Sequence, residues 1–137
     1  PERGLEMLPS FTLDLVRGVG TYAMELLRAA PDLDTVYAPI GLGSGICGLI
    51  TARDALGLKT KIVGCVSTNA PAYALSFAAK KTIETNSADT FADGVAVRIP
   101  SAEALDIIFT GAERIVQVSD AEVEEAMRAY YTDTHQL

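Results

Sequence analysis

The fold of this chain is decided by residues 35–48, which read Thr35-Val36-Tyr37-Ala38-Pro39-Ile40-Gly41-Leu42-Gly43-Ser44-Gly45-Ile46-Cys47-Gly48. The first six residues form a short apolar run that is typical of a buried strand. The glycine turn after it leads into a helix that should end at Gly57, and a second apolar strand follows at 61–66. Strand, glycine turn, helix and strand together predict a βαβ unit with parallel strands.

The segments on either side of this unit extend the α/β pattern. Apolar residues at helical spacing predict a helix over 15–27, in which Gly18 and Gly20 indicate either close backbone packing or a helix start near Gly20. Further elements are expected downstream: helices at 70–79 and 101–112, and strands at 95–99 and 115–118. The predicted fold class is α/β, with three layers in which a mostly parallel sheet is flanked by helices.

The last helix begins with a recognisable cap. Ser119-Asp120-Ala121-Glu122 has the spacing of a capping box, in which a serine and a glutamate satisfy each other's backbone amides. The apolar residues of the helix are Val123, Ala126, Met127 and Tyr130. Their spacing predicts one face that points inward.

Composition restricts the classes of partner. The 137 residues carry 11 Lys and Arg against 18 Asp and Glu, a net charge of −7, without a basic cluster. Such a surface repels phosphate backbones and acidic lipids, so we expect neither nucleic-acid nor membrane partners. Both uncharged runs long enough to approach a membrane span contain proline and are interpreted as buried structure. Cys47 and Cys65 lie in apolar runs and predict reduced thiols in a cytoplasmic protein.

The glycine turn is the candidate site for chemistry. A strand that feeds a helix through glycines exposes unpaired backbone amides, which bind anions such as phosphate, and Ser44 could add a hydroxyl donor. The alternative is a purely structural tight turn. Residues 43–48 also match the dinucleotide pattern G-x-G-x-x-G, but residues 66–69 offer no carboxylate or arginine for the ribose. A P-loop is excluded because no Gly-Lys-Ser/Thr follows.

Other kinds of chemistry find little support in the residues. Ser44 lacks the glycines of a nucleophile elbow, and the only histidine, His135, stands at the end of the chain. Neither cysteine has a close second metal ligand, so no metal site is predicted. Asp89 and Asp93 bracket a polar loop and are interpreted as turn residues.

Several stretches resemble one enzyme family in the correct order. The glycine turn is similar to the phosphate loop of pyridoxal-phosphate enzymes of the tryptophan-synthase β fold, fold type II, in particular the threonine/serine dehydratases. Four further matches are Gly18-Val19-Gly20-Thr21, Pro31-Asp32-Leu33-Asp34, residues 90–97 with Ala92-Asp93-Gly94, and residues 116–122. The resemblance extends over nearly all of the chain.

This resemblance implies a cofactor site and a reaction. The amides of Gly41, Leu42, Gly43, Ser44 and Gly45 would hold the phosphate of pyridoxal 5′-phosphate, and Gly94 would lie beside the pyridine ring. The family removes water from L-threonine or L-serine, giving a 2-oxo acid and ammonia. The alternatives are β-replacement, racemisation, or a nucleotide-binding α/β module without chemistry. An amino-acid substrate and a homo-oligomer are the expected partners.

Departures from the family pattern suggest a partial domain. The family's catalytic lysine lies in a Ser-Phe-Lys motif upstream of the phosphate loop, whereas Ser76-Phe77-Ala78 has alanine and lies downstream. We therefore expect residues 1–137 to be one fragment of the large cofactor domain, without the lysine segment and the small domain. Its further partners would be the remaining segments of the same enzyme, which would cover an open sheet edge and an apolar face.

Two smaller departures concern individual positions. Val66 and Ala72 stand where relatives often have Mg²⁺ or Ca²⁺ ligands, so that metal site is predicted to be absent. Leu42 and Ser44 replace two glycines of the usual phosphate loop. Amide donation remains possible if neither residue needs a positive φ.

Overall fold

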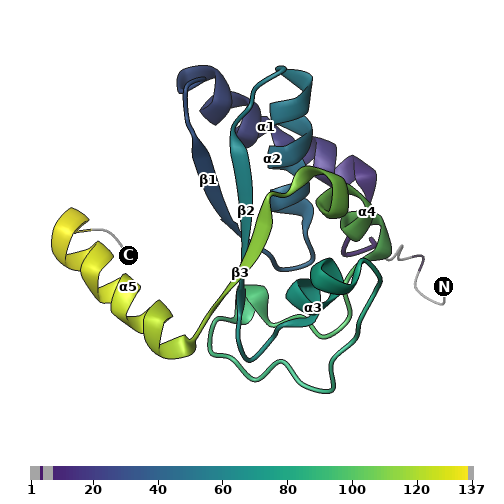
Figure 1. Ribbon diagram of the computed structural model, residues 1–137, viewed down its shortest axis with the longest axis vertical. Coiled ribbons are helices and arrows are strands. Elements are labelled where there is room, and N and C mark those ends of the chain that lie inside the picture. Colours follow the sequence, from purple (N-terminus) through teal and green to yellow (C-terminus); the bar gives the residue numbers. More distant parts are fainter. Residues whose placement is uncertain (1–3, 5–7, 136–137) are drawn as a thin grey trace.

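The computed structural model describes residue 4 and residues 8–135 and has the predicted α/β architecture (Figure 1). Its helices and strands are, in chain order, α1 (Leu13–Ala29), β1 (Thr35–Pro39), α2 (Ser44–Ala55), β2 (Lys61–Ser67), α3 (Ala72–Ala79), the 3-10 helix η1 (Asp93–Val95), α4 (Ala102–Gly111), β3 (Arg114–Val118) and α5 (Asp120–Thr134). Within the described residues, no helix combines the length and the apolar character that crossing a membrane requires.

The three strands form one parallel sheet in the order β1-β2-β3. The parallel pairing predicted for the βαβ unit is therefore confirmed, with Val36 opposite Ile62 and Ala38 opposite Gly64. β2 lies in the centre and is almost fully buried, as expected for a strand paired on both sides. The covered face of the sheet packs against α2, since a Cβ on Gly64 would lie 3.2 Å from Ile46.

The other face of the sheet is more open. Tyr37 on β1 is 59 % exposed, and its hydroxyl accepts a hydrogen bond from Arg114 on β3 at 3.3 Å. On β2, Val63 lies opposite both Tyr37 and Arg114, and Cys65, two residues further along the strand, is half-buried. Lys61 on β2, which shares this face with Val63 and Cys65, is exposed as well.

Helices α1 and α2 cross at two glycines. A Cβ on Gly48 would lie only 3.1 Å from the Cα of Gly20, so the two backbones touch without an intervening side chain. The Thr12 side chain caps α1 by accepting a hydrogen bond from the N–H of Leu15. This cap decides between the two interpretations of the early glycines: the helix begins at Leu13, and Gly20 serves close packing.

The strand predicted at 95–99 is wrong. Residues 93–95 form η1, in which the N–H of Ala96 donates to the carbonyl of Asp93 at 3.0 Å. The alternation of apolar and polar residues suggested two faces, but a strand also needs a neighbouring strand to pair with. Apart from local turn bonds such as that from the N–H of Val97 to the carbonyl of Val95, the segment accepts one backbone bond from another part of the described chain, from the N–H of Thr85 to the carbonyl of Arg98.

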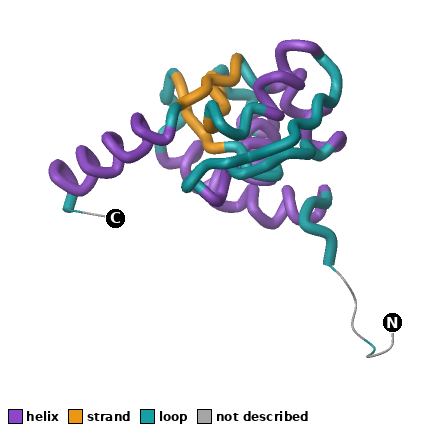
Figure 2. Tube along the Cα trace, turned by 90° about the horizontal axis from the view of Figure 1, so that it is seen from below, coloured by secondary structure: helices purple, strands orange, loops and turns teal. Residues whose placement is uncertain are grey.

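The last helix has its predicted cap but not its predicted burial. Both halves of the capping box are present at Ser119 and Glu122. However, α5 projects away from the rest of the protein in both views (Figures 1 and 2) and contains no buried residue. Met127 and Tyr130 are each 53 % exposed. The expected inward face does point toward the sheet, where it lines an open pocket of about 470 Å³ with Cys65 and Val118.

Candidate functional site

The glycine turn lies where β1 ends and α2 begins. The N–H of Ile40 still donates to the carbonyl of Cys65 at 2.9 Å, so the chain leaves the sheet only after residue 40. Gly43 then caps α2 in a left-handed conformation, with φ 99° and ψ −3°. Among the described residues other than glycine, only Lys80 and His135 have a positive φ. Neither Leu42 nor Ser44 has a positive φ, so neither position requires glycine for the loop to adopt this conformation.

The backbone amides of residues 41–46 form a potential anion cradle. The first helical bond of α2 runs from the N–H of Cys47 to the carbonyl of Gly43 at 3.0 Å, which leaves the amides before it outside the helical ladder. No acceptor in the described part of the chain takes the N–H groups of residues 41–46, and the first turn of α2 has no acidic residue. Unpaired amides at the positive end of a helix dipole fit a phosphate group.

The side of the loop that faces the core is held by Tyr73. This residue lies at the start of α3 and is 1 % exposed. Its hydroxyl donates to the carbonyl of Leu42 at 2.7 Å and accepts from the N–H of Ser101 at 3.0 Å. Burial raises the pKa of Tyr73 to about 12, so its hydroxyl keeps the proton that it donates. The sequence analysis missed this residue, although a tyrosine inside an apolar helix signals a buried hydroxyl in need of partners.

Gly94 approaches the loop from a distant part of the sequence. A Cβ on Gly41 would lie 2.4 Å from the carbonyl oxygen of Gly94, so the two backbones are in direct contact. On Gly94 itself, a Cβ would meet no atom of the described residues within 4 Å. The structure thus brings together all six residues that the resemblance assigned to a cofactor, from Gly41 to Gly45 and Gly94, and leaves open space beside Gly94.

Asp120 anchors the segment that leads to Gly94. Its carboxylate accepts hydrogen bonds from the hydroxyls of Thr90 and Ser67 and from the N–H of Phe91. The hydrogen bond from Thr90, followed by those from Phe91, Ser67 and Asn69, lowers the pKa of Asp120. Sequence reasoning identified Asp120 only as part of a helix start. Its second role links the ends of β2 and β3 to the loop before Gly94.

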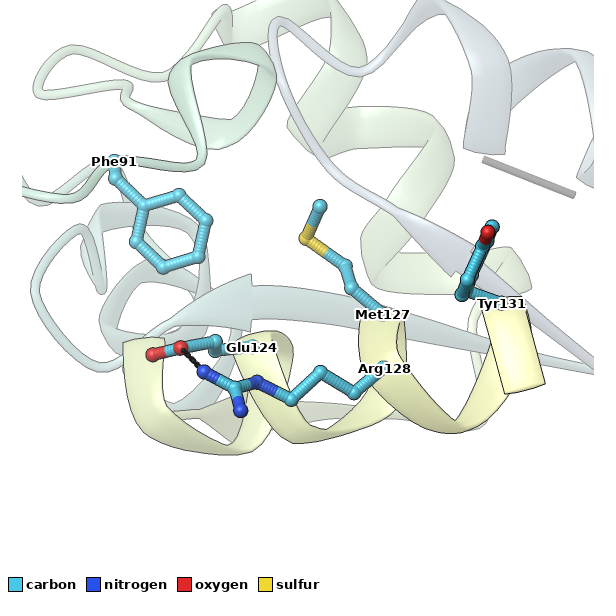
Figure 3. A pocket seen from close by; sticks show the side chains of 5 residues that line it. All are labelled: Phe91, Glu124, Met127, Arg128 and Tyr131. Carbon is cyan, nitrogen blue, oxygen red and sulfur yellow. Dashed lines mark hydrogen bonds and ion pairs between the residues drawn. The ribbon is translucent and has the colours of Figure 1, made fainter.

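A separate apolar pocket of about 450 Å³ lies between Phe91 and α5 (Figure 3). Its other lining residues are Met127, Tyr131 and the exposed ion pair Glu124–Arg128, which lies along the helix. It contains no residue of the glycine loop and no nucleophile. We therefore take the loop, and not this pocket, as the candidate site.

The remaining sequence-level candidates stay outside the site. Val66 is 1 % exposed and belongs to the core, and the described residues contain no group of three His, Cys, Asp or Glu side chains that could hold a metal ion. His135 follows the C-terminal end of α5. Both cysteines are free thiols, and burial raises the pKa of Cys47 to about 12, which disfavours a nucleophilic thiolate.

Comparison with known proteins identifies the family of the chain. Residues 2–137 match a family described as pyridoxal-phosphate dependent enzyme. The L-threonine ammonia-lyase of Geobacter sulfurreducens is 31% identical over 137 residues, covering 99% of this chain and 34% of that protein. The chain spans about a third of the length of the curated relatives it matches.

Solved structures with the same fold include two kinds of enzyme. The processed form of threonine deaminase isoform 2 from Solanum lycopersicum superposes with a TM-score of 0.93 at 27% identity, covering 99% of this chain and 40% of that one. A serine racemase from maize superposes with a TM-score of 0.81 at 29% identity, covering 85% of this chain and 36% of that one.

Proposed function

The chain belongs to the pyridoxal-phosphate-dependent enzyme family, and on this premise we propose that its glycine loop binds the cofactor phosphate in a threonine/serine dehydratase. The reaction would be the α,β-elimination of water from L-threonine or L-serine, with a 2-oxo acid and ammonia as final products. The observation that carries the proposal is the row of N–H groups at residues 41–46 with no acceptor in the described protein.

The described residues fit the phosphate end of such a cofactor. The amides of Gly41, Leu42, Gly43, Ser44 and Gly45 would donate to the phosphate oxygens, and the positive end of α2 would favour their negative charge. The Ser44 hydroxyl, which has no partner among the described residues, would add a donor. Gly94 has the open space at its Cα that a flat ring needs for close approach.

The chemistry of the reaction comes from the cofactor. When bound, pyridoxal phosphate provides an electron sink for the electrons left on the substrate when its α-proton departs. The role of residues 41–45 and 94 is to fix its position. We further propose that residues 1–137 form one part of the large cofactor domain, that the lysine which binds the cofactor and the small domain belong to other segments of the same enzyme, and that this enzyme is a homo-oligomer.

Racemisation is the second candidate, because the maize serine racemase shares the fold at 29% identity. Both reactions begin with loss of the α-proton, so the loop is equally suited to either. Elimination is preferred because the relatives that cover most of this chain are L-threonine ammonia-lyases.

The free thiols Cys47 and Cys65 support a reducing compartment such as the cytoplasm.

The test is a product assay on the full-length protein loaded with pyridoxal phosphate. L-threonine should yield 2-oxobutanoate and ammonia, and L-serine should yield pyruvate. Formation of D-serine from L-serine without a 2-oxo acid would favour the racemase instead. Binding of NAD but not of pyridoxal phosphate would overturn both proposed reactions, elimination and racemisation, in favour of a nucleotide-binding module.

A further inference from the structure

We propose that Tyr73 is a positioning residue, which sets the orientation of the Leu42–Gly43 peptide so that its N–H faces the cofactor phosphate. This inference rests on the proposed function, since it concerns the same loop. Tyr73 lies in α3 and does not itself belong to the row of amides. It acts on them through the backbone.

The argument begins with the geometry of one peptide group. The carbonyl of Leu42 and the N–H of Gly43 belong to the same planar unit and point in opposite directions. Tyr73 donates to that carbonyl at 2.7 Å from the buried side of the loop. Fixing the oxygen toward the core therefore turns the Gly43 N–H away from the core, the side on which the proposed phosphate would bind.

This peptide needs such a restraint because of the residue that follows it. Gly43 has no side chain and a φ of 99°, so it tolerates backbone conformations that other residues avoid. A peptide before such a glycine can rotate at little steric expense. Rotation would present the Leu42 oxygen, instead of the Gly43 hydrogen, to an incoming phosphate.

The Tyr73 hydroxyl is itself held in place. It accepts the N–H of Ser101 at 3.0 Å, and Ser101 is the N-cap of α4. A Cβ on Gly43 would lie 3.4 Å from the same hydroxyl and 2.9 Å from the Cβ of Ala104 in α4. The ring is buried and the hydroxyl is fixed between two elements, so its donor has a single direction.

A second tyrosine provides a matched control. Tyr22 on α1 also donates to a carbonyl of this region, that of Gly45, at 3.2 Å. Gly45 lies inside α2, where the helix already uses its carbonyl. Tyr22 is 44 % exposed, and because the helix holds that peptide, removal of the Tyr22 hydroxyl should leave its orientation unchanged.

The test compares pyridoxal phosphate with pyridoxal, which lacks the phosphate, as ligands of the full-length protein. Tyr73→Phe keeps the ring and removes the hydroxyl. We expect it to reduce the preference for pyridoxal phosphate over pyridoxal by about 10- to 100-fold, the range for a hydrogen bond to a charged group. Tyr22→Phe should keep the preference. Titration by absorbance or fluorescence gives both dissociation constants.

The outcomes separate this inference from the proposed function. If the unmodified protein does not prefer pyridoxal phosphate over pyridoxal, the phosphate cradle itself is wrong. If it does, and Tyr73→Phe retains that preference or weakens both ligands equally, Tyr73 has only a structural role. Replacement of Tyr73 by 4-aminophenylalanine, which retains a donor at the same position, should preserve the preference even if Tyr73→Phe does not fold. Its loss in that folded variant would overturn the proposal.

Discussion

The contact between Gly41 and Gly94 provides the sharpest test of the site's geometry. In Gly41→Ala, the new Cβ would start 2.4 Å from the carbonyl oxygen of Gly94 and would have to move about 1 Å to reach ordinary contact at 3.4 Å. The obstructing atom belongs to the backbone, so no side-chain rotation relieves the clash. Either the glycine loop or the segment around Gly94 must shift.

The expected consequence has two parts. Overpacking of this kind lowers the free energy of unfolding by about 1–3 kcal/mol. The separation also moves Gly94 away from the loop, so the affinity for pyridoxal phosphate should fall. Urea unfolding of the full-length protein without cofactor measures the first effect, and titration with pyridoxal phosphate measures the second.

Gly94→Ala is the matched control on the other side of the same contact. No atom in the described part of the chain lies within 4 Å of the Cβ it would add, so the cofactor-free protein should unfold at the same urea concentration as the unmodified one. Cofactor affinity should nevertheless decrease, because the methyl group enters the space proposed for the ring. The reasoning is refuted if Gly41→Ala leaves both stability and affinity unchanged, or if Gly94→Ala destabilises the cofactor-free protein equally.

Three further predictions concern residues outside the loop. The hydrogen bond from Thr90, followed by those from other donors, holds the pKa of Asp120 in the folded protein below its ordinary value of 3.8. The ionised carboxylate therefore stabilises the fold above pH 3.8, and this stabilisation is lost as the pH falls through the lowered pKa of the folded state. Urea unfolding between about pH 5 and pH 2 should show the unmodified protein losing stability relative to Asp120→Asn, and parallel profiles would contradict this. Burial raises the pKa of both thiols, and it raises that of Cys47 to about 12. Iodoacetamide at pH 8 should therefore label the half-buried Cys65 first and the buried Cys47 very slowly, which mass spectrometry measures. The guanidinium of Arg53 donates to two backbone carbonyls, at 3.0 and 3.2 Å. Arg53→Met should therefore lower the free energy of unfolding by about 1–3 kcal/mol, as measured by calorimetry, and an unchanged melting temperature would contradict this.

The βαβ unit could be predicted because its signals are local. The strand at 35–39, the turn at Gly43, the helix and the strand at 61–67 each follow from neighbouring residues, and a tight connection leaves few ways to arrange them. The capping box at Ser119 is local in the same sense. Local hydrogen bonds and glycine conformations do not depend on the rest of the fold.

The errors arose where the outcome depends on partners distant in sequence. The alternating residues 95–99 had the pattern of a strand but no strand to pair with, and the turn at Asp93 formed instead. The apolar residues of α5 identify the face that would be buried, but a periodic pattern does not show what covers that face. Tyr73 was missed for a related reason, since its partners, Leu42 and Ser101, lie 31 and 28 residues away.

The crossing of α1 and α2 at Gly20 and Gly48 fixes how far α2 stands from its neighbour. A contact made by main-chain atoms has no rotamers through which it could adapt. The spacing of α1 and α2 at this point is therefore set by two glycine hydrogen atoms in place of side chains. In Gly48→Ala, the added methyl group would lie 3.1 Å from the Cα of Gly20, so α1 and α2 would have to move apart and the glycine turn at the start of α2 would move with its helix.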